Sequence, residues 1–587
     1  MKWILRGKRG NAEKMAADLG LSEITAQVLL NRGIYSAKGV REFFDPRLEA
    51  FGDISSLSEV EKGFEIVKES IRKDEKITVY GDYDADGVMS STILIKGLRG
   101  LGAKAECYIP HRLYEGYGLN MGAVKKIADG GTGLIICCDN GIAAIEECGY
   151  IKALGMKLVV LDHHSPYTDK SGNEILPKAD ALIDLKLKGC NYSFKELCAG
   201  GLCYRFISGL YASIGRKIDK EAELFIFASI ATICDMVELQ GENRVFAHLG
   251  LRLMNSRKNT NLGLREVISA LSLSGKEIDD RSVGFGIGPF INSAGRMGKA
   301  ADYIDIFLSD NREIVTELVE ELKVLNEQRK LLTDEAYIKA AERLKDNNVD
   351  KVIVEYLPDI HESLAGLAAG KLKERFSRPV IVLSKGESCV KGSGRSVEGY
   401  NMFSAVNGCR DLLLRFGGHS QAVGLSLDEG NIAELKRRLN EGCSLSLEDM
   451  EKKIYIDRET GFNEITLELS RELKALKPFG TGNPSPVFAA KGVFVKRLRF
   501  VGKQRRVVQF VFYHSETEFK GVGFGIFDKL KDFIISRCGE NVWDGLYNGQ
   551  GVVQFFADIL FGIEENFFNG RSSVQLVLED FRAFEEG

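Results

Sequence analysis

The sequence of 587 residues has little of several features that define particular protein classes. It contains 10 prolines, no low-complexity tract and no internal repeat, which excludes collagen-like, proline-rich and solenoid chains. Its 12 cysteines include no CxxC pair, so we expect buried, reduced thiols and no disulfide framework. The longest apolar stretch, 224–234, is much shorter than the about 20 residues of a membrane span, so no transmembrane segment is predicted.

The chain also lacks a strong excess of either charge. Its 79 basic and 83 acidic residues give a net charge of −4, so any nucleic-acid site must be a local patch. The N-terminus, MKWILRGKRGNAEK, has no apolar stretch followed by small residues, so no secretory signal is predicted and we expect a cytoplasmic protein. At roughly 150 residues per domain, the length predicts three to five domains.

Four short runs rich in β-branched and aliphatic residues alternate with helix-length segments in the first half of the chain. They cover residues 77–80, 134–138, 157–161 and 181–183. This alternation predicts a parallel sheet with helices on its faces. The first three runs are followed at once by Asp82, by Asp139, and by Asp162 with His163 and His164. Because parallel strands end at the same edge of a sheet, we expect these polar clusters to meet there.

The second half contains a long helix and two further regions. Residues 312–345 have apolar positions at helical spacing without Pro or Gly, which predicts one long helix or two that join two domains. A second α/β region follows, with strands predicted at 351–357 and 379–384 and glycine-rich loops at 392–396 and 416–424. After about residue 455, short strands predict a small sandwich or barrel.

The segment GDYDADG holds the densest polar cluster, Asp82, Asp84 and Asp86. An EF-hand loop is excluded because its twelfth position is Ile93, not Glu, and because a strand precedes the loop. Three carboxylates within five residues repel one another unless a cation neutralises them, so a metal site is predicted. The alternative is a solvated turn in which Gly87 supplies the bend.

Asp139 and Asp235 also follow apolar stretches, where an acid is unfavourable to bury unless it is paired or bound to a metal. Taken singly, Asp139 could cap the next helix and Asp235 could be a satisfied core acid. Taken together, the carboxylates and imidazoles without a thiolate favour Mn²⁺ or Mg²⁺ over a structural zinc.

Four motifs then resemble, in order, those of the DHH phosphoesterase superfamily: VYGDYDADG, CDNG, LDHH and ICDMVEL. Later segments are similar to its branch of single-strand-specific exonucleases. They are INSAGRMG at 291–298, KGSGRS at 391–396, FGGHSQAVG at 416–424 and KPFGTGNPSPVF at 477–488. The resemblance covers nearly the whole chain. It implies an α/β protein in which a parallel-sheet DHH domain and a second α/β, DHH-associated domain are joined by a long helix and followed by a C-terminal OB-like β-barrel.

The domain division that follows is an N-terminal extension (1–60), a DHH catalytic domain (61–311), a connecting helix (312–345), a DHH-associated domain (346–455) and an OB-like single-strand-binding domain (456–587).

The resemblance also implies two metal ions, Mn²⁺ or Mg²⁺. Asp82 would serve one ion, Asp84, His163 and Asp235 would serve the other, and Asp139 would bridge the two. Asp162 would orient the neighbouring imidazoles, and His164 would face the scissile phosphate. Some family members have a His two positions before the first Asp; here that residue is Tyr80, which leaves the first ion one ligand short.

Phosphate groups need cations away from the metals. The candidates are Arg112, Arg296, Arg395 and His419, with Ser393 in a glycine-flanked segment that lets backbone N–H groups approach a phosphate. The basic stretch 491–506 suggests a single-strand track formed by Phe494, Lys496, Arg497, Arg499 and Phe500. The alternative for this stretch is a solvated hairpin with both phenylalanines in the core.

From the resemblance we expect a 5′→3′ exonuclease that hydrolyses single-stranded DNA to 5′-mononucleotides in DNA repair and recombination. A single-strand-binding protein or a helicase is a candidate partner. Two alternatives stay open: a DHH phosphodiesterase acting on short oligoribonucleotides or cyclic dinucleotides, and a non-catalytic single-strand-binding scaffold. The β-rich terminal domain argues against the first, and the intact set of acids and histidines argues against the second.

Overall fold

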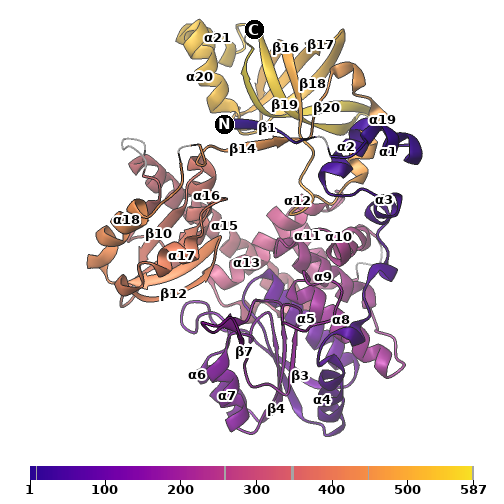
Figure 1. Ribbon diagram of the computed structural model, residues 1–587, viewed down its shortest axis with the longest axis vertical. Helices are drawn as coiled ribbons and strands as arrows, with labels where there is room; N and C mark the ends of the chain where they lie inside the picture. Colours follow the sequence, from indigo (N-terminus) through magenta and orange to yellow (C-terminus); the bar gives the residue numbers. More distant parts are fainter. Residues whose placement is uncertain (8, 257–259, 345–349, 447, 585–587) are drawn as a thin grey trace. The chain divides into compact units, whose positions relative to one another are not determined.

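The computed structural model describes residues 1–587 except 8, 257–259, 345–349, 447 and 585–587 (Figure 1). These residues form two compact units. One comprises Glu49–Val237 and Gly241–Lys452; the other comprises Met1–Leu48, Glu238–Gln240 and Lys453–Gly587. Among the described helices, none is both long enough and apolar enough to cross a membrane.

The larger unit begins with a five-stranded parallel sheet in the order β3-β2-β4-β5-β8. Its strands are β2 (Lys76–Tyr80), β3 (Lys104–Tyr108), β4 (Thr132–Cys138), β5 (Lys157–Asp162) and β8 (Ala181–Asp184). The four predicted strands are confirmed. The fifth strand, β3, lies at the sheet edge and is largely exposed, so its sequence KAECY lacks the apolar run that marks the others.

Helices cover both faces of this sheet (Figure 1). On one face lie α6 (Met121–Asp129) and α7 (Ile145–Ala153); on the other lie α4 (Val60–Arg72), α5 (Ala85–Gly100) and α8 (Ala199–Ser213). The apolar stretch 224–234 belongs to α9 (Glu221–Cys234), which packs on α5 and α8 and is buried along almost its whole length. This enclosed position explains why α9 is apolar all round.

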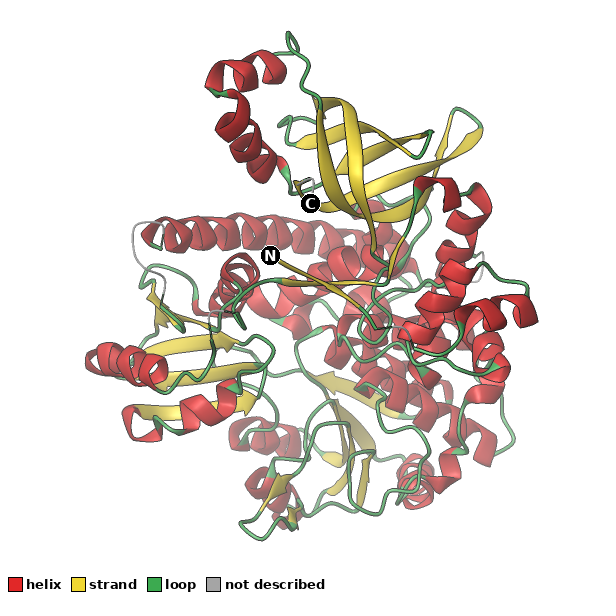
Figure 2. Cartoon of the chain, turned by 45° about the horizontal axis from the view of Figure 1, so that its top comes forward, coloured by secondary structure: helices red, strands yellow, loops and turns green. Residues whose placement is uncertain are grey.

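A helical region leads from this sheet to the second one. It contains α10 (Gly241–Met254), α11 (Leu262–Ala270), α12 (Asp280–Ser282), α13 (Gly288–Met297) and α14 (Asp305–Leu308). The predicted long helix is confirmed as one uninterrupted element, α15 (Arg312–Arg343), about 48 Å long at 1.5 Å per residue (Figure 2).

The second sheet has five strands in the order β12-β13-β11-β10-β9. They are β9 (Ile353–Tyr356), β10 (Val380–Lys385), β11 (Val390–Arg395), β12 (Leu413–His419) and β13 (Ala422–Leu427), with helices α16 (Ala365–Phe376), α17 (Met402–Asn407) and α18 (Ile432–Glu441). The prediction of loops at the glycine-rich segments was wrong, because these residues form β11, β12 and β13. A Cβ at Gly392 would lie 2.4 Å from Leu383, so this glycine serves close packing within the sheet.

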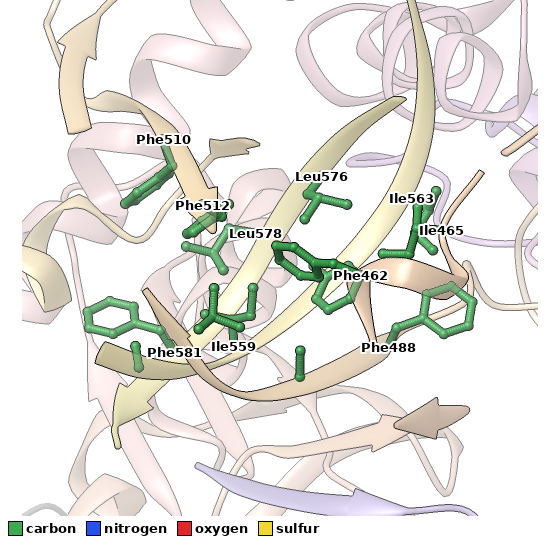
Figure 3. Packing of buried hydrophobic residues seen from close by; sticks show 14 of the residues in the cluster. Phe462, Ile465, Phe488, Phe510, Phe512, Ile559, Ile563, Leu576, Leu578 and Phe581 are labelled. Atoms are coloured by element: carbon green, nitrogen blue, oxygen red, sulfur yellow. The ribbon is translucent and has the colours of Figure 1, made fainter. Parts of the chain in front are cut away.

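The smaller unit is built on a β-barrel. Its strands run in the order β15-β16-β17-β18-β20-β19, and pairing of β16 with β19 closes it. They are β15 (Arg458–Glu459), β16 (Phe488–Val501), β17 (Val507–His514), β18 (Thr517–Gly523), β19 (Phe555–Phe568) and β20 (Arg571–Ala583). Aromatic and aliphatic side chains fill the core, among them Phe462, Phe488 and Phe512 (Figure 3). Helices α19 (Leu467–Ala475), α20 (Phe527–Cys538) and α21 (Glu540–Tyr547) complete this part of the unit.

The N-terminal residues belong to the same unit as the barrel. Strand β1 (Lys2–Leu5) pairs in parallel with β14 (Lys453–Ile456), and α1 (Ala12–Leu19), α2 (Glu23–Asn31) and α3 (Ala37–Phe44) contribute to the barrel's core cluster. The buried Asp457 carboxylate accepts hydrogen bonds from Arg32 at 2.7 Å and from Asn31 at 3.0 Å. Because these contacts join residues more than 400 positions apart, the sequence pattern alone did not reveal them.

Candidate metal centre and phosphate site

The turn after β2 brings the GDYDADG carboxylates together. Asp82 and Asp86 are buried, and Asp84 caps α5 by accepting a hydrogen bond from the Gly87 N–H at 3.1 Å. A Cβ at Gly87 would lie 2.6 Å from the backbone nitrogen of Asp82, so only glycine permits this compact turn. The burial of two of the three acids excludes a solvated turn.

Asp139 follows β4 in a left-handed conformation, with φ of 62°. Its carboxylate lies 3.2 Å from His163 Nε2, and its N–H donates to Leu161 O at 3.2 Å. Helix α7 is instead preceded by Ala144 as its N-cap, so Asp139 is not a helix cap. Asp235 ends α9 and places a carboxylate oxygen 3.9 Å from His163 Nδ1. The predicted acids and His163 therefore converge at the carboxyl edge of the sheet.

Among the described residues, three groups of side chains could each hold an ion. Within each group the ligand atoms all lie within 4.8 Å of one another. They are Asp82 with Asp84 and Asp139, Asp86 with His163 and Asp235, and Asp139 with His163 and His164. Asp139 is shared by two groups, which fits a bridging position. The second group contains Asp86, where the resemblance placed Asp84.

The ligand set implied by the resemblance left out Asp86, although the D-x-D-x-D run had already placed it in the predicted metal site. Its carboxylate also accepts hydrogen bonds from the Ala199 and Gly200 N–H groups at 2.9 and 2.7 Å. Asp86 thus ties the first turn of α8 to the acid cluster.

The cluster carries more negative charge than its surroundings compensate. Burial, followed by neighbouring carboxylates, raises the pKa of Asp82 and Asp139 well above the usual range, that of Asp86 to about 6 and that of Asp235 to about 8. One buried oxygen of Asp82, Oδ1, has no hydrogen-bond partner among the described residues. Burial and the charge of His164 lower the pKa of His163 to about 3, which keeps its imidazole neutral and able to coordinate. Oxygen and neutral imidazole donors with an unsatisfied carboxylate fit a pair of Mn²⁺ or Mg²⁺ ions.

Asp162 and His164 form a pair beside this cluster. Asp162 Oδ1 lies 2.8 Å from His164 Nδ1, and its Oδ2 accepts from the Ile142 N–H at 2.9 Å. Burial alone would raise the pKa of Asp162, but the hydrogen bond and charge of His164 lower it to about 2. Burial alone would lower the pKa of His164, but the hydrogen bond and charge of Asp162 raise it to about 9. Among the described residues, Asp162 is hydrogen-bonded to the ring of His164 and to the backbone N–H of His163, but not to the ring of His163.

Guanidinium groups gather next to the acids. Arg296 on α13 donates to Ser363 O at 3.0 Å, and Arg395 at the end of β11 donates to Ser393 Oγ at 3.1 Å. Burial and the charges of Arg112, Arg395 and Arg329 lower the pKa of Arg296 to about 9. In the described part of the chain, none of these four arginines forms an ion pair with a carboxylate. We call these four guanidinium groups, of Arg112, Arg296, Arg329 and Arg395, the arginine cluster.

The arginine cluster and the acids influence one another directly. The charges of Arg112 and His164 oppose the rise in the pKa of Asp82. Burial and the charges of Arg395 and His164 lower the pKa of His419. The predicted phosphate residues therefore lie around the predicted metal ligands. Arg329 on α15, which donates to Asn326 Oδ1 at 2.9 Å, is an addition that no motif indicated.

The predicted barrel residues have different surroundings. Phe500 is buried against Phe527, Trp543 and Tyr547, so its assignment to a single-strand track was wrong. Phe494 is half-buried and its ring lies 5.1 Å from that of Phe556. The remaining predicted side chains are polar: Lys496 pairs with Glu518 at 2.8 Å, Arg499 donates to Gln509 at 2.7 Å, and Arg497 is exposed.

Comparisons with known proteins agree with this architecture. Residues 76–230 match the DHH family, N-terminal domain; residues 349–444 match the DHHA1 domain; and residues 456–580 match the RecJ OB domain. The fold and the acid cluster define a DHH phosphoesterase.

The chain is 33% identical over 557 residues to the single-stranded-DNA-specific exonuclease RecJ of Bacillus subtilis (strain 168), covering 93% of this chain and 69% of that protein. It is 29% identical to the RecJ of Escherichia coli (strain K12), covering 94% and 95%. The chain belongs to the RecJ family.

Solved structures support the same assignment. RecJ from Thermus thermophilus in complex with Mn²⁺ has a TM-score of 0.80 at 24% identity, covering all of this chain and 80% of that one, and shows the shared fold. A manganese-bound exonuclease RecJ has a TM-score of 0.58 at 30% identity, covering 67% of this chain and 98% of that one.

Proposed function

We propose that this protein is a metal-dependent exonuclease that hydrolyses single-stranded DNA in the 5′→3′ direction, releases 5′-mononucleotides and acts in DNA repair and recombination. The observation that carries the proposal is the acid cluster with its unsatisfied Asp82 oxygen, set beside the arginine cluster. Metal ligands next to unpaired guanidinium groups fit a phosphodiester substrate. The strand specificity follows the relatives, which are single-stranded-DNA-specific exonucleases.

The ligands that would hold two Mn²⁺ or Mg²⁺ ions are Asp82, Asp84, Asp139, His163 and Asp235, with Asp86 added by its geometry. When bound, such ions lower the pKa of an attacking water and stabilise the charge on the scissile phosphate. Sharing of Asp139 between two groups supports its bridging role. The two ions would supply the positive charge that balances the buried carboxylates.

The other residues position the substrate. Asp162 holds Nδ1 of His164, and the raised pKa keeps this imidazole positively charged. Its Nε2–H, which lies 3.4 Å from the Tyr117 hydroxyl, would donate to a phosphate oxygen. Arg112 and Arg296 would bind non-reacting phosphates. Arg395, held by Ser393, would bind a terminal 5′-phosphate together with His419.

On the barrel, we assign the binding of single-stranded DNA to a row of aromatic side chains. Phe494 on β16 is in register with Tyr513 on β17 and with Phe556 on β19. Tyr513 and Phe556 are exposed, so the row offers ring surfaces on which bases can stack. This row replaces the buried Phe500, and the exposed Arg497 would add a phosphate contact. A cytoplasmic location, and a single-strand-binding protein or helicase as partner, also belong to this proposal.

Oligonucleotides labelled at either end, incubated with Mn²⁺, test the function. A 5′-phosphorylated single strand should lose one nucleotide at a time from its 5′ end, while a blunt duplex and a closed single-stranded circle should resist. Arg395→Ala should weaken the preference for a 5′-phosphate about tenfold and change turnover less, whereas the exposed Arg410→Ala should change neither. Label released first from the 3′ end would contradict the polarity, and rapid cutting of the circle would contradict an exonuclease.

A further inference from the structure

The segment 111–120, between β3 and α6, is fixed to the sheet by several hydrogen bonds. Tyr80, the residue that stands in place of a His in some relatives, is fully buried and donates from its hydroxyl to Gly118 O at 2.9 Å. Glu115 accepts from the Tyr108 hydroxyl at 2.5 Å and from the His111 N–H at 2.6 Å. Segment 111–120 is thus held to β2 through Gly118 and to β3 through Glu115.

Tyr117 lies within this segment between two glycines with positive φ, Gly116 at 82° and Gly118 at 76°. Glycine adopts this conformation without the steric penalty that other residues meet, so the sequence EGYG permits the sharp turns on either side of Tyr117. The Tyr117 side chain is 54% exposed, although it emerges beside the buried acid cluster.

The hydroxyl of Tyr117 contacts two residues of the candidate centre. It donates to the backbone carbonyl of Asp139 at 2.9 Å and lies 3.4 Å from His164 Nε2. The Tyr117 and His164 rings meet edge to face, with centroids 6.0 Å apart. No motif had singled out Tyr117, because a tyrosine between glycines is also typical of an ordinary turn.

Asp139 is the residue whose geometry most needs support. Its φ of 62° is a left-handed conformation, which aspartate adopts more readily than most residues but which still raises the backbone energy unless neighbouring contacts hold it. The Leu161 carbonyl holds its N–H, and the Tyr117 hydroxyl holds its C=O. With both peptide groups fixed, the carboxylate is directed into the two ligand groups that share it.

We propose that Tyr117 is a positioning residue of the metal centre: its hydroxyl holds the Asp139 backbone in the left-handed turn and limits the orientation of His164. This inference rests on the proposed function, because the reaction that Tyr117 would support is the proposed hydrolysis. Tyr117 is the side chain that would fix the direction of the Asp139 carboxylate. The exposed ring is available for substrate contact, but the positioning role belongs to the hydroxyl.

Tyr117→Phe removes only that hydroxyl. Metal-supporting hydrogen bonds beyond the ligands typically change metal affinity or activity by roughly 10- to 100-fold, so we expect Mn²⁺ affinity and kcat to fall about tenfold, with KM for a single strand nearly unchanged. Mn²⁺ affinity is measured by electron paramagnetic resonance titration without substrate, and kcat and KM with a 5′-phosphorylated single strand. Tyr114→Phe is the matched control, since Tyr114 lies in the same segment, is 75% exposed and makes no hydrogen bond through its hydroxyl to any described residue.

Wild-type Mn²⁺ affinity and kcat in Tyr117→Phe would overturn the proposal, as would equal losses in Tyr114→Phe. A second variant, Tyr117→Ala, separates hydroxyl from ring: if only Tyr117→Ala is impaired, and through KM, the ring contacts the strand and the positioning role is wrong. The titration does not depend on nuclease activity. A wild-type protein that binds Mn²⁺ but spares single strands would contradict the proposed function, while a loss of affinity in Tyr117→Phe would still support the positioning role.

Discussion

The acidic edge of the parallel sheet and the outer face of the barrel are both proposed to bind nucleic acid, but they treat charge in opposite ways. At the sheet edge, carboxylates are buried together and raise one another's pKa. On the barrel, three of the seven basic side chains of 491–506 are paired with acids: Lys491 with Glu459, Lys496 with Glu518, and Arg506 with Asp528. Like charges left unpaired indicate a site completed by an external ion, whereas paired charges indicate a surface where stacking carries more of the binding.

This comparison predicts all-or-none effects at the sheet edge and graded effects on the barrel. The largest effect is expected for Asp139→Ala, which removes the carboxylate shared by two ligand groups. Turnover with Mn²⁺ or Mg²⁺ should fall below a few per cent, as expected when a metal ligand is lost, while single-strand binding and the circular dichroism spectrum stay unchanged. Asp129→Ala, at an exposed acid of the same unit, is the control. Substantial residual turnover in Asp139→Ala would remove the basis for a shared ligand.

A second effect concerns the metal-free protein. The pKa of Asp235 is raised from 3.8 to about 8, mainly by burial and by Asp86, so the folded state binds this proton more tightly than the unfolded state. Stability should therefore be highest below about pH 4 for this group and should fall as the pH rises towards 8. In EDTA we expect Tm to fall as the pH rises from 6 to 8, because below the folded-state pKa each pH unit lowers the unfolding free energy by about 1.4 kcal/mol for one such proton.

Saturating Mg²⁺ should remove most of this pH dependence, because the ion replaces the proton as counter-charge. Asp235→Asn should flatten the profile in EDTA even without Mg²⁺. Parallel melting profiles for wild type and Asp235→Asn would show that the carboxylate is not buried against like charge.

The two regions also differ in how far their sequences predict them. The metal ligands lie in short local motifs at strand ends, so Asp82, Asp139 and His163 could be placed at one edge from the strand pattern alone. Phe500 could not be placed correctly, because its burial depends on Trp543 and Tyr547 of α21, a helix that no strand pattern predicts. The pairing of Lys496 with Glu518 depends on barrel register, and that of β1 with β14 joins residues 451 positions apart, such as Lys2 and Lys453. Contacts made through register or long-range packing leave no local signal.

On the barrel, the strongest single effect is expected from the aromatic row. Phe556→Ala and Phe494→Ala should each weaken binding of a long single strand about tenfold, since stacking contributes ~1–3 kcal/mol per base. Phe524→Ala, at a 61% exposed phenylalanine outside the row, should have no effect. A strand of abasic sites offers no bases, so wild type and row variants should bind it equally. A truncation near residue 455 would remove the barrel, but it would also cut through β14, the partner of β1, and expose the N-terminal helices that pack in the barrel's core cluster. Point variants avoid this disruption.

The smallest effect should separate paired from unpaired charge on the same strand of the barrel. Arg497 is exposed and forms no ion pair with a carboxylate within the described residues, so Arg497→Ala should lower the slope of log K against log salt by about 0.7, the value for one phosphate contact on a single strand. The double variant Lys496→Ala/Glu518→Ala removes an ion pair with no net charge and should leave the slope unchanged. Both slopes are measured by fluorescence anisotropy of a labelled strand across a salt series. If the double variant changes the slope and Arg497→Ala does not, Lys496 leaves Glu518 and contacts a phosphate when DNA binds. The contrast in charge pairing between the sheet edge and the barrel would then be weaker than the DNA-free structure indicates.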